Sequence, residues 1–257
     1  GRAVVNLLRL SEGEQITDCR PVRDFNLPGH FLMMATRKGL VKKTPLEAYS
    51  RPKRGGIIAV KLRDDDELVD VVISKPGDEV LLATSGGMAI RFQESDARSM
   101  GRNTSGVKGI TLSGNDELVG MVIVDPEETL LTVCANGYGK RTPFGPHAAS
   151  NETDQAAVED SSSSTRYRTQ RRGGKGVRDI KTTKRNGNVV GISRVNDDDE
   201  VLMMTSGGKL QRLAVGEISI IGRNTQGVRI MSLQEGERVK GIARVPQDDD
   251  EIDVSST

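Results

Sequence analysis

A repeat of about fifty residues is the feature that most constrains how this chain can fold. Its first part is an apolar segment, a turn that contains glycine, and a second segment. This part occurs four times, at Phe31–Thr44, Val80–Phe92, Leu130–Thr142 and Val201–Leu213. Short apolar segments on both sides of a glycine turn are typical of a β-hairpin, so the pattern predicts four hairpins.

A second strand–turn–strand pattern follows each hairpin and opens with a glycine, at Gly56, Gly106, Gly176 and Gly227. A further copy starts at Gly1 with no hairpin before it, so we expect the chain to begin within a repeat. Two hairpins per repeat predict a four-stranded sheet, and sheets repeated radially form propellers. No segment keeps apolar residues at helical spacing over three turns. The predicted fold is all-β, a propeller-like array of about five four-stranded blades with an incomplete N-terminal blade.

Two polar segments interrupt or follow the repeats, and residues 1–246 are otherwise predicted to form one β-domain. Residues 146–165 lengthen the third repeat, are rich in serine and lack an apolar period, which predicts a disordered insertion. Residues 247–257 are predicted to be an unstructured acidic tail. No apolar run approaches the ~20 residues of a membrane helix, so we expect no association with a membrane. Cys19 and Cys134 match no metal or disulfide motif and are expected to be free thiols.

The net charge of +1 conceals a repeated distribution of basic residues. One basic residue stands four residues after each turn glycine, and the connecting loops carry more. The positions after the turns are Lys42, Lys43, Arg91, Lys140, Arg141 and Arg212, and those in the loops are Arg51, Lys53, Arg54, Arg102, Arg171, Arg172, Lys175 and Arg223. Arranged in phase around a propeller, they predict a positive belt suited to the phosphates of nucleic acid. For a single copy, the alternative is a solvated charged face that binds nothing.

The belt predicts binding to duplex DNA rather than to single strands. Tyr138 is the one aromatic residue near it, whereas proteins that bind single strands stack bases on aromatic side chains. Nothing resembles a recognition helix, so contacts from Arg and Lys to phosphate are expected to be largely independent of sequence. The chain has no phosphate-binding loop for ATP, and His30, His147 and Tyr167 lack the neighbours of a metal or nucleophile site. We therefore expect no catalytic residue, metal or cofactor in this chain.

One heptad is more specific than the rest of the basic loops. Its residues are Gln170, Arg171, Arg172, Gly173, Gly174, Lys175 and Gly176. The glycines let a loop approach a polyanion closely and free backbone N–H groups for phosphate oxygens. The heptad resembles the box Gln-(Arg/Lys)-Arg-Gly-Gly-(Arg/Lys)-Gly of the C-terminal DNA-wrapping domain of the DNA gyrase A subunit. VVNLLRL near the start, ANGYGKRT and EISIIGRNTQGV resemble the same family, so the resemblance covers nearly all of the chain outside residues 146–165 and 247–257.

This resemblance implies a fold and a function. In that family the domain is a β-pinwheel, a propeller variant in which blades exchange strands, and duplex DNA wraps around its basic perimeter. The domain is non-catalytic and supports ATP-dependent negative supercoiling. The implied partners are the gyrase A N-terminal region and gyrase B in an A2B2 holoenzyme, whose other parts use ATP and Mg²⁺, in the bacterial cytoplasm with the nucleoid. The family's principal box lies in the first blade, so Gln170–Gly176, in the next-to-last repeat, is interpreted as a second box.

Two alternatives remain at this point. One is the related C-terminal domain of topoisomerase IV, which lacks a strong box, so that Gln170–Gly176 argues against it. The other is a propeller that serves as a scaffold for protein interactions. A scaffold of that kind would bind no duplex DNA at moderate salt.

Overall fold

The computed structural model of the protein describes residues 10, 13–14, 16–53, 56–147 and 164–245. The predicted insertion is therefore described only at its two ends. The predicted tail and most of the copy that starts at Gly1 lie outside the described residues. The regular structure consists of β-strands and single turns of 3-10 helix, which confirms the predicted all-β content.

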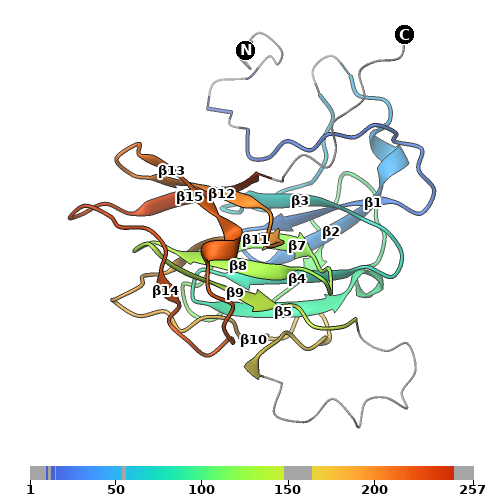
Figure 1. Ribbon diagram of the computed structural model, residues 1–257. Helices are drawn as coiled ribbons and strands as arrows, with labels where there is room; N and C mark the ends of the chain where they lie inside the picture. Colours follow the sequence, from blue (N-terminus) through green and yellow to red (C-terminus); the bar gives the residue numbers. More distant parts are fainter. Residues whose placement is uncertain (1–9, 11–12, 15, 54–55, 148–163, 246–257) are drawn as a thin grey trace, which may run out of the picture. The chain divides into compact units, whose positions relative to one another are not determined.

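The strands form four sheets, and Figure 1 labels most of them along the chain. Sheet A contains, in spatial order, β3 (Leu68–Ser74), β1 (Phe31–Thr36), β2 (Leu40–Pro45) and β6 (Val107–Lys108). Sheet B contains β10 (Val177–Arg178), β5 (Met88–Gln93), β4 (Glu79–Thr84) and β7 (Leu118–Ile123). Sheet C contains β11 (Val189–Val195), β8 (Thr129–Cys134), β9 (Tyr138–Pro143) and β14 (Val228–Arg229). Sheet D contains β13 (Leu210–Ala214), β12 (Glu200–Thr205) and β15 (Val239–Val245).

The first part of each repeat forms the predicted hairpin. β1 pairs antiparallel with β2, β8 with β9 and β12 with β13, each across a tight glycine turn. At the first turn the N–H of Gly39 donates to the carbonyl of Thr36 over 2.8 Å, and Gly39 has φ +79°. A residue with a side chain rarely adopts that conformation, so the turn requires the glycine that marks it in the sequence.

The second part of each repeat does not form the predicted hairpin. β6 pairs with β2 in sheet A, with Leu40 opposite Lys108, whereas β7, after the same polar turn, lies in sheet B. β10 pairs with β5 and β14 with β9 in the same way. Three sheets thus take their fourth strand from a later repeat, as the family resemblance implied. Among the described residues sheet D has three strands, so a fourth strand for the last predicted unit is not seen in this part of the chain.

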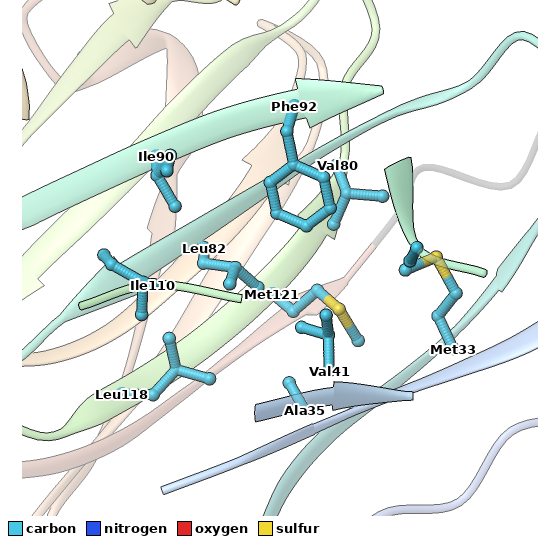
Figure 2. Packing of buried hydrophobic residues seen from close by; sticks show 11 residues of the cluster. Met33, Ala35, Val41, Val80, Leu82, Ile90, Phe92, Ile110, Leu118 and Met121 are labelled. Atoms are coloured by element: carbon cyan, nitrogen blue, oxygen red, sulfur yellow. The ribbon is translucent and has the colours of Figure 1, made fainter. Parts of the chain in front are cut away.

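The described chain has two compact units, and each has its own apolar core. Unit 1 comprises residues 1–82, 90–123 and 170–176, and unit 2 comprises residues 83–89, 124–169 and 177–257. Figure 2 shows the core of unit 1, in which the side chains of Met33, Val41, Leu82, Phe92 and Met121 pack among others. The core of unit 2 includes Leu131, Val133, Val201, Met203 and Val239. Because both units are built from the same repeat, equivalent strands supply both cores.

Short 3-10 turns lead from the hairpins into the basic loops. They are η2 (Leu46–Tyr49) after β2, η3 (Glu94–Asp96) after β5 and η6 (Val215–Glu217) after β13. Leu46 and Val215 are fully buried and anchor two of these turns. The loop that follows each turn then carries its basic residues and ends at the glycine that opens the next strand–turn–strand pattern of the sequence.

Candidate nucleic-acid interface

The basic residues four positions after the turn glycines are mostly buried. Lys43, Arg91 and Arg141 are at most 5% exposed. Each makes an ion pair within its own unit: Lys43 Nζ with Glu94 Oε2 at 2.5 Å, Arg91 with Glu79, and Arg141 with Asp197. Side chains that are buried and neutralised in this way cannot reach a phosphate, so the predicted exposed belt is wrong at these positions.

The cause is that the central strands of the sheets are covered on both faces. In β2, β5 and β9 the interior residues are all buried, with no alternation between buried and exposed positions. A sheet with one solvated face, as in many antiparallel sheets, would leave alternate positions exposed. A basic residue in a doubly covered strand must be paired, because an isolated buried charge is strongly unfavourable.

The second basic position after the turns is buried as well. Lys140 Nζ lies 2.8 Å from Asp179 Oδ1, and neither side chain is exposed. Lys42 holds the equivalent place, but Ala59 replaces the acid, and Lys42 donates to the backbone carbonyl of Ala59 instead. Burial, and then the charge of Arg102, lower the pKa of Lys42 to about 8. Neither lysine is available to DNA, so this part of the predicted belt is also wrong.

Three loop arginines donate hydrogen bonds to backbone carbonyls. They stand four residues before an opening glycine, and each binds the carbonyl of the residue that stands two positions after the preceding opening glycine. Arg102 Nη1 donates to Ile58 O over 3.2 Å, Arg172 donates to Lys108 O and to Asp96 O, and Arg223 Nη1 donates to Arg178 O over 2.9 Å. All three are partly buried. They therefore brace the loops, and only part of each guanidinium faces solvent.

The heptad Gln170–Gly176 is fixed to unit 1 by backbone hydrogen bonds. The N–H of Gln170 donates to Arg91 O over 2.7 Å, and the N–H of Gly173 donates to Gly109 O over 2.8 Å. Gly173 has φ +86°, a conformation that favours glycine. Arg171 and Lys175 are exposed. These two residues, rather than Arg172, are the charges that the heptad presents to a ligand.

The remaining predicted positions differ in exposure. Arg51 and Lys53 are exposed in the loop after η2, and Arg54 lies outside the described residues. The side chain of Arg212 is 64% exposed, but it pairs with Glu200. Gly174 is exposed, and Gly176 is partly buried with φ +76°.

One set of exposed basic residues was missed by the sequence argument. Lys108, Arg178 and Arg229 hold the second position of β6, β10 and β14, which are edge strands of sheets A, B and C. All three side chains are exposed, and within the described residues none pairs with a carboxylate. The signal was present in the sequence, since a Lys or Arg stands two residues after the opening glycine in three copies.

The described residues contain no group of three or more His, Cys, Asp or Glu side chains arranged to hold a metal ion. Tyr167 is buried, and its hydroxyl donates to Asp179. Burial, and then the charge of Asp179, raise the pKa of Tyr167 well above its usual value, so this phenol is poorly suited to act as a nucleophile. Among the described residues, no helix is long and apolar enough to span a membrane.

Comparisons with known proteins agree with the arrangement of strands. The solved structure of a DNA gyrase A C-terminal domain superposes with a TM-score of 0.78 at 24% identity, covering 95% of this chain and 74% of that one. The C-terminal domain of DNA topoisomerase IV gives a TM-score of 0.80 at 24% identity, covering 95% and 70%. These likenesses confirm the predicted β-pinwheel fold.

Sequence comparisons identify the family. The DNA gyrase A subunit of Salmonella typhimurium is 44% identical over 255 residues, which is 98% of this chain. The corresponding protein of Escherichia coli (strain K12) is 42% identical over 256 residues, and that of Staphylococcus aureus (strain MRSA252) is 39% identical over 253. The chain spans about a quarter of the length of these relatives, 26–27%. A family model described as "DNA gyrase C-terminal domain, beta-propeller" matches residues 30–75, 78–125, 163–196 and 199–246. The chain therefore belongs to the DNA gyrase C-terminal domain family of beta-propellers.

Proposed function

We propose that this chain binds and wraps duplex DNA without sequence preference, as the C-terminal domain of a DNA gyrase A subunit. Residues 1–246 serve as one DNA-binding domain in this proposal. The role of the wrap is to present DNA to the rest of the enzyme in a fixed sense, so that strand passage introduces negative supercoils.

The observation that carries the proposal is the repeated exposed cation on the edge strands. Lys108, Arg178 and Arg229 recur at one position of the repeat, the second residue of an edge strand, and all three are exposed. Cations that recur with the repeat suit the phosphate backbone, which carries charge at regular intervals. The loops add exposed charges at Arg51, Lys53, Arg171 and Lys175. We name these seven residues the rim cations.

The catalytic work belongs to other parts of the enzyme in this proposal. The chain is non-catalytic and holds no cofactor, while ATP and Mg²⁺ are used by the gyrase A N-terminal region and gyrase B in an A2B2 holoenzyme. The enzyme would act in the bacterial cytoplasm, on the DNA of the nucleoid. Relatives that extend well beyond this chain and bear the name of the gyrase A protein support this division of labour.

A DNA-topology assay tests the proposal. The chain is incubated with relaxed closed-circular plasmid, a type I topoisomerase removes the unconstrained supercoils, and the linking number is measured after the protein is removed. A wrap leaves a change in linking number that grows with the protein-to-DNA ratio. A variant with Lys108→Gln, Arg178→Gln and Arg229→Gln is expected to lose most of that change.

The matched control carries Lys75→Gln, Lys209→Gln and Lys240→Gln, which remove three exposed charges outside β6, β10 and β14. It loses the same net charge and should retain the topological change. An unchanged linking number with the wild-type chain would reject wrapping. An equal loss in both variants would show that net charge, and not the position in these three short strands, determines binding.

A further inference from the structure

The polar turn of the third repeat has the opposite charge to its counterparts. In the other repeats this turn carries acids, at Asp64–Glu67, Asp116–Glu117, and Glu235 with Glu237. The third repeat has Lys184 and Arg185 in the same turn, and both are exposed. The turn acids of the first two repeats neutralise a nearby cation, since Arg37 pairs with Glu67 of the first turn and with Glu117 of the second. The polar turn of the third repeat lacks these acids and carries positive charge instead.

The basic turn is held in one conformation by two asparagines. Asn186 is fully buried; its Nδ2 donates to Lys181 O over 3.0 Å and to Gln226 O over 3.1 Å, and its Oδ1 accepts from Thr183 N over 2.8 Å. Asn136 Nδ2 donates to the carbonyls of Lys184 and Arg185, each over 3.1 Å. The backbone that carries Arg185 is therefore fixed before any ligand binds.

Tyr138 brings two arginines together beside this turn. Its hydroxyl accepts from Arg185 Nε over 3.1 Å and from Arg229 Nη2 over 3.3 Å. The two guanidinium carbons lie 5.1 Å and 5.7 Å from the centre of the same ring. Tyr138 begins β9, and Arg229 lies in the adjacent edge strand β14, with the two residues directly opposite in register.

The arrangement leaves most of the donors of both arginines free for an anion. A guanidinium has five N–H donors, and each of these two gives one to the phenol. Neither pairs with a carboxylate among the described residues, so two like charges converge on one neutral oxygen. Their hydrogen bonds lower the pKa of Tyr138. A phosphate group would satisfy the fork geometry of both and relieve their repulsion.

We propose that Arg185 and Arg229, positioned by Tyr138, form a clamp that binds one phosphodiester of duplex DNA. The clamp rests on the proposed DNA-wrapping function and makes sheet C a stronger anchor than the single cation of β6 or β10. Tyr138 is a positioning residue, because it orders the two guanidiniums and does not itself contact the phosphate.

Binding of the full chain to a mixed-sequence duplex over a range of salt concentrations tests the clamp. Arg185→Gln should lower the affinity. Because Arg185 and Arg229 share one phosphodiester, the double variant Arg185→Gln and Arg229→Gln should also reduce the log–log salt slope by about 0.9, the value for one phosphate contact. Tyr138→Phe keeps every charge and the ring, so its slope should stay near that of the wild type while its affinity falls several-fold. Lys108→Gln, a rim cation with no aromatic partner, provides a slope change of similar size for comparison.

A second measurement separates this inference from the proposed function. Inorganic phosphate is titrated into the full chain while the arginine Nε–H signals are followed by NMR. Shifts at Arg185 and Arg229 that are weakened in Tyr138→Phe support the clamp. If the wild type binds DNA but Arg185→Gln and Tyr138→Phe match it in affinity and slope, the clamp is rejected and the DNA-binding proposal stands. If the wild type binds no duplex DNA, the proposed function fails, and phosphate-induced shifts would identify a site for free phosphate alone.

Discussion

Arg91 and Arg212 hold the same position in two repeats, and their surroundings differ completely. Arg91 pairs with Glu79, twelve residues earlier, and neither side chain is more than 1% exposed. Arg212 pairs with Glu200 across the same sequence separation, but its side chain is 64% exposed. The same spacing between glutamate and arginine therefore occurs at both places. The sequence does not show whether another part of the chain covers the strand. This burial determines how much each ion pair contributes to stability.

Replacing one member of each pair measures the difference. Arg91→Gln removes the positive charge that neutralises the buried Glu79 carboxylate, so we expect a loss of about 3–5 kcal/mol in unfolding free energy. Arg212→Gln removes an exposed ion pair and should cost about 0–1 kcal/mol. Urea denaturation followed by circular dichroism gives both values, and each variant loses one positive charge. Equal shifts of the two unfolding midpoints would contradict the assignment of burial.

At the scale of elements, the strand exchange could be predicted from the family resemblance but not from the local sequence pattern. The segments on either side of Gly114 have the composition of a hairpin, and local composition cannot say which neighbour a strand will pair with. β6 pairs with β2 because the opening glycine, Gly106, sits against the backbone of that strand: a Cβ on Gly106 would lie 2.4 Å from Val41 O. The first hairpins were predictable because their partners are adjacent in sequence and their turn glycines are required locally.

Gly106→Ala tests this docking. Gly106 has φ +91° and Gly77 has φ +89°, but a Cβ at Gly77 would meet nothing within 4 Å. Gly77→Ala should therefore cost about 1–2 kcal/mol, the strain of the left-handed backbone alone. Gly106→Ala adds the collision with Val41 and should cost clearly more, with loss of amide protection in β6 by hydrogen exchange. Similar costs for the two variants would show that β6 docks loosely.

At the scale of the whole molecule, a net charge of +1 coexists with a set of exposed, unneutralised basic residues because the charges are sorted by burial. Basic residues in the central strands neutralise buried acids, and those on the edge strands and loops face solvent. The sequence predicted the family, the strand content and the recurrence of basic residues. It placed the belt on Lys43, Arg91 and Arg141 because a repeated position is visible in sequence and the covering of both sheet faces is not.

The salt dependence of DNA binding measures how many of these charges act together. The seven rim cations would give a log–log slope of about −6 for a duplex long enough to meet them all, at about −0.9 per phosphate, because Arg185 shares the phosphate of Arg229. A short duplex reaches fewer of them and should give a proportionally shallower slope. Fluorescence anisotropy with labelled duplexes of two lengths gives both slopes. A slope that does not change with length would mean that a single site carries the binding, and no wrap forms.

The strand exchange also determines when each sheet can be completed while the chain is being synthesised. β2 is complete at Pro45, but its neighbour β6 begins only at Val107. In the same way, β5 pairs with β10, which begins at Val177, and β9 pairs with β14, which begins at Val228. These waiting periods overlap, so a nascent chain carries at least one unfilled sheet edge from Pro45 until Val228 has been synthesised. Open edges invite pairing with other chains, and slow translation over this interval prolongs the exposure. The edge strands of the earlier sheets are therefore paired only after the later repeats have been synthesised.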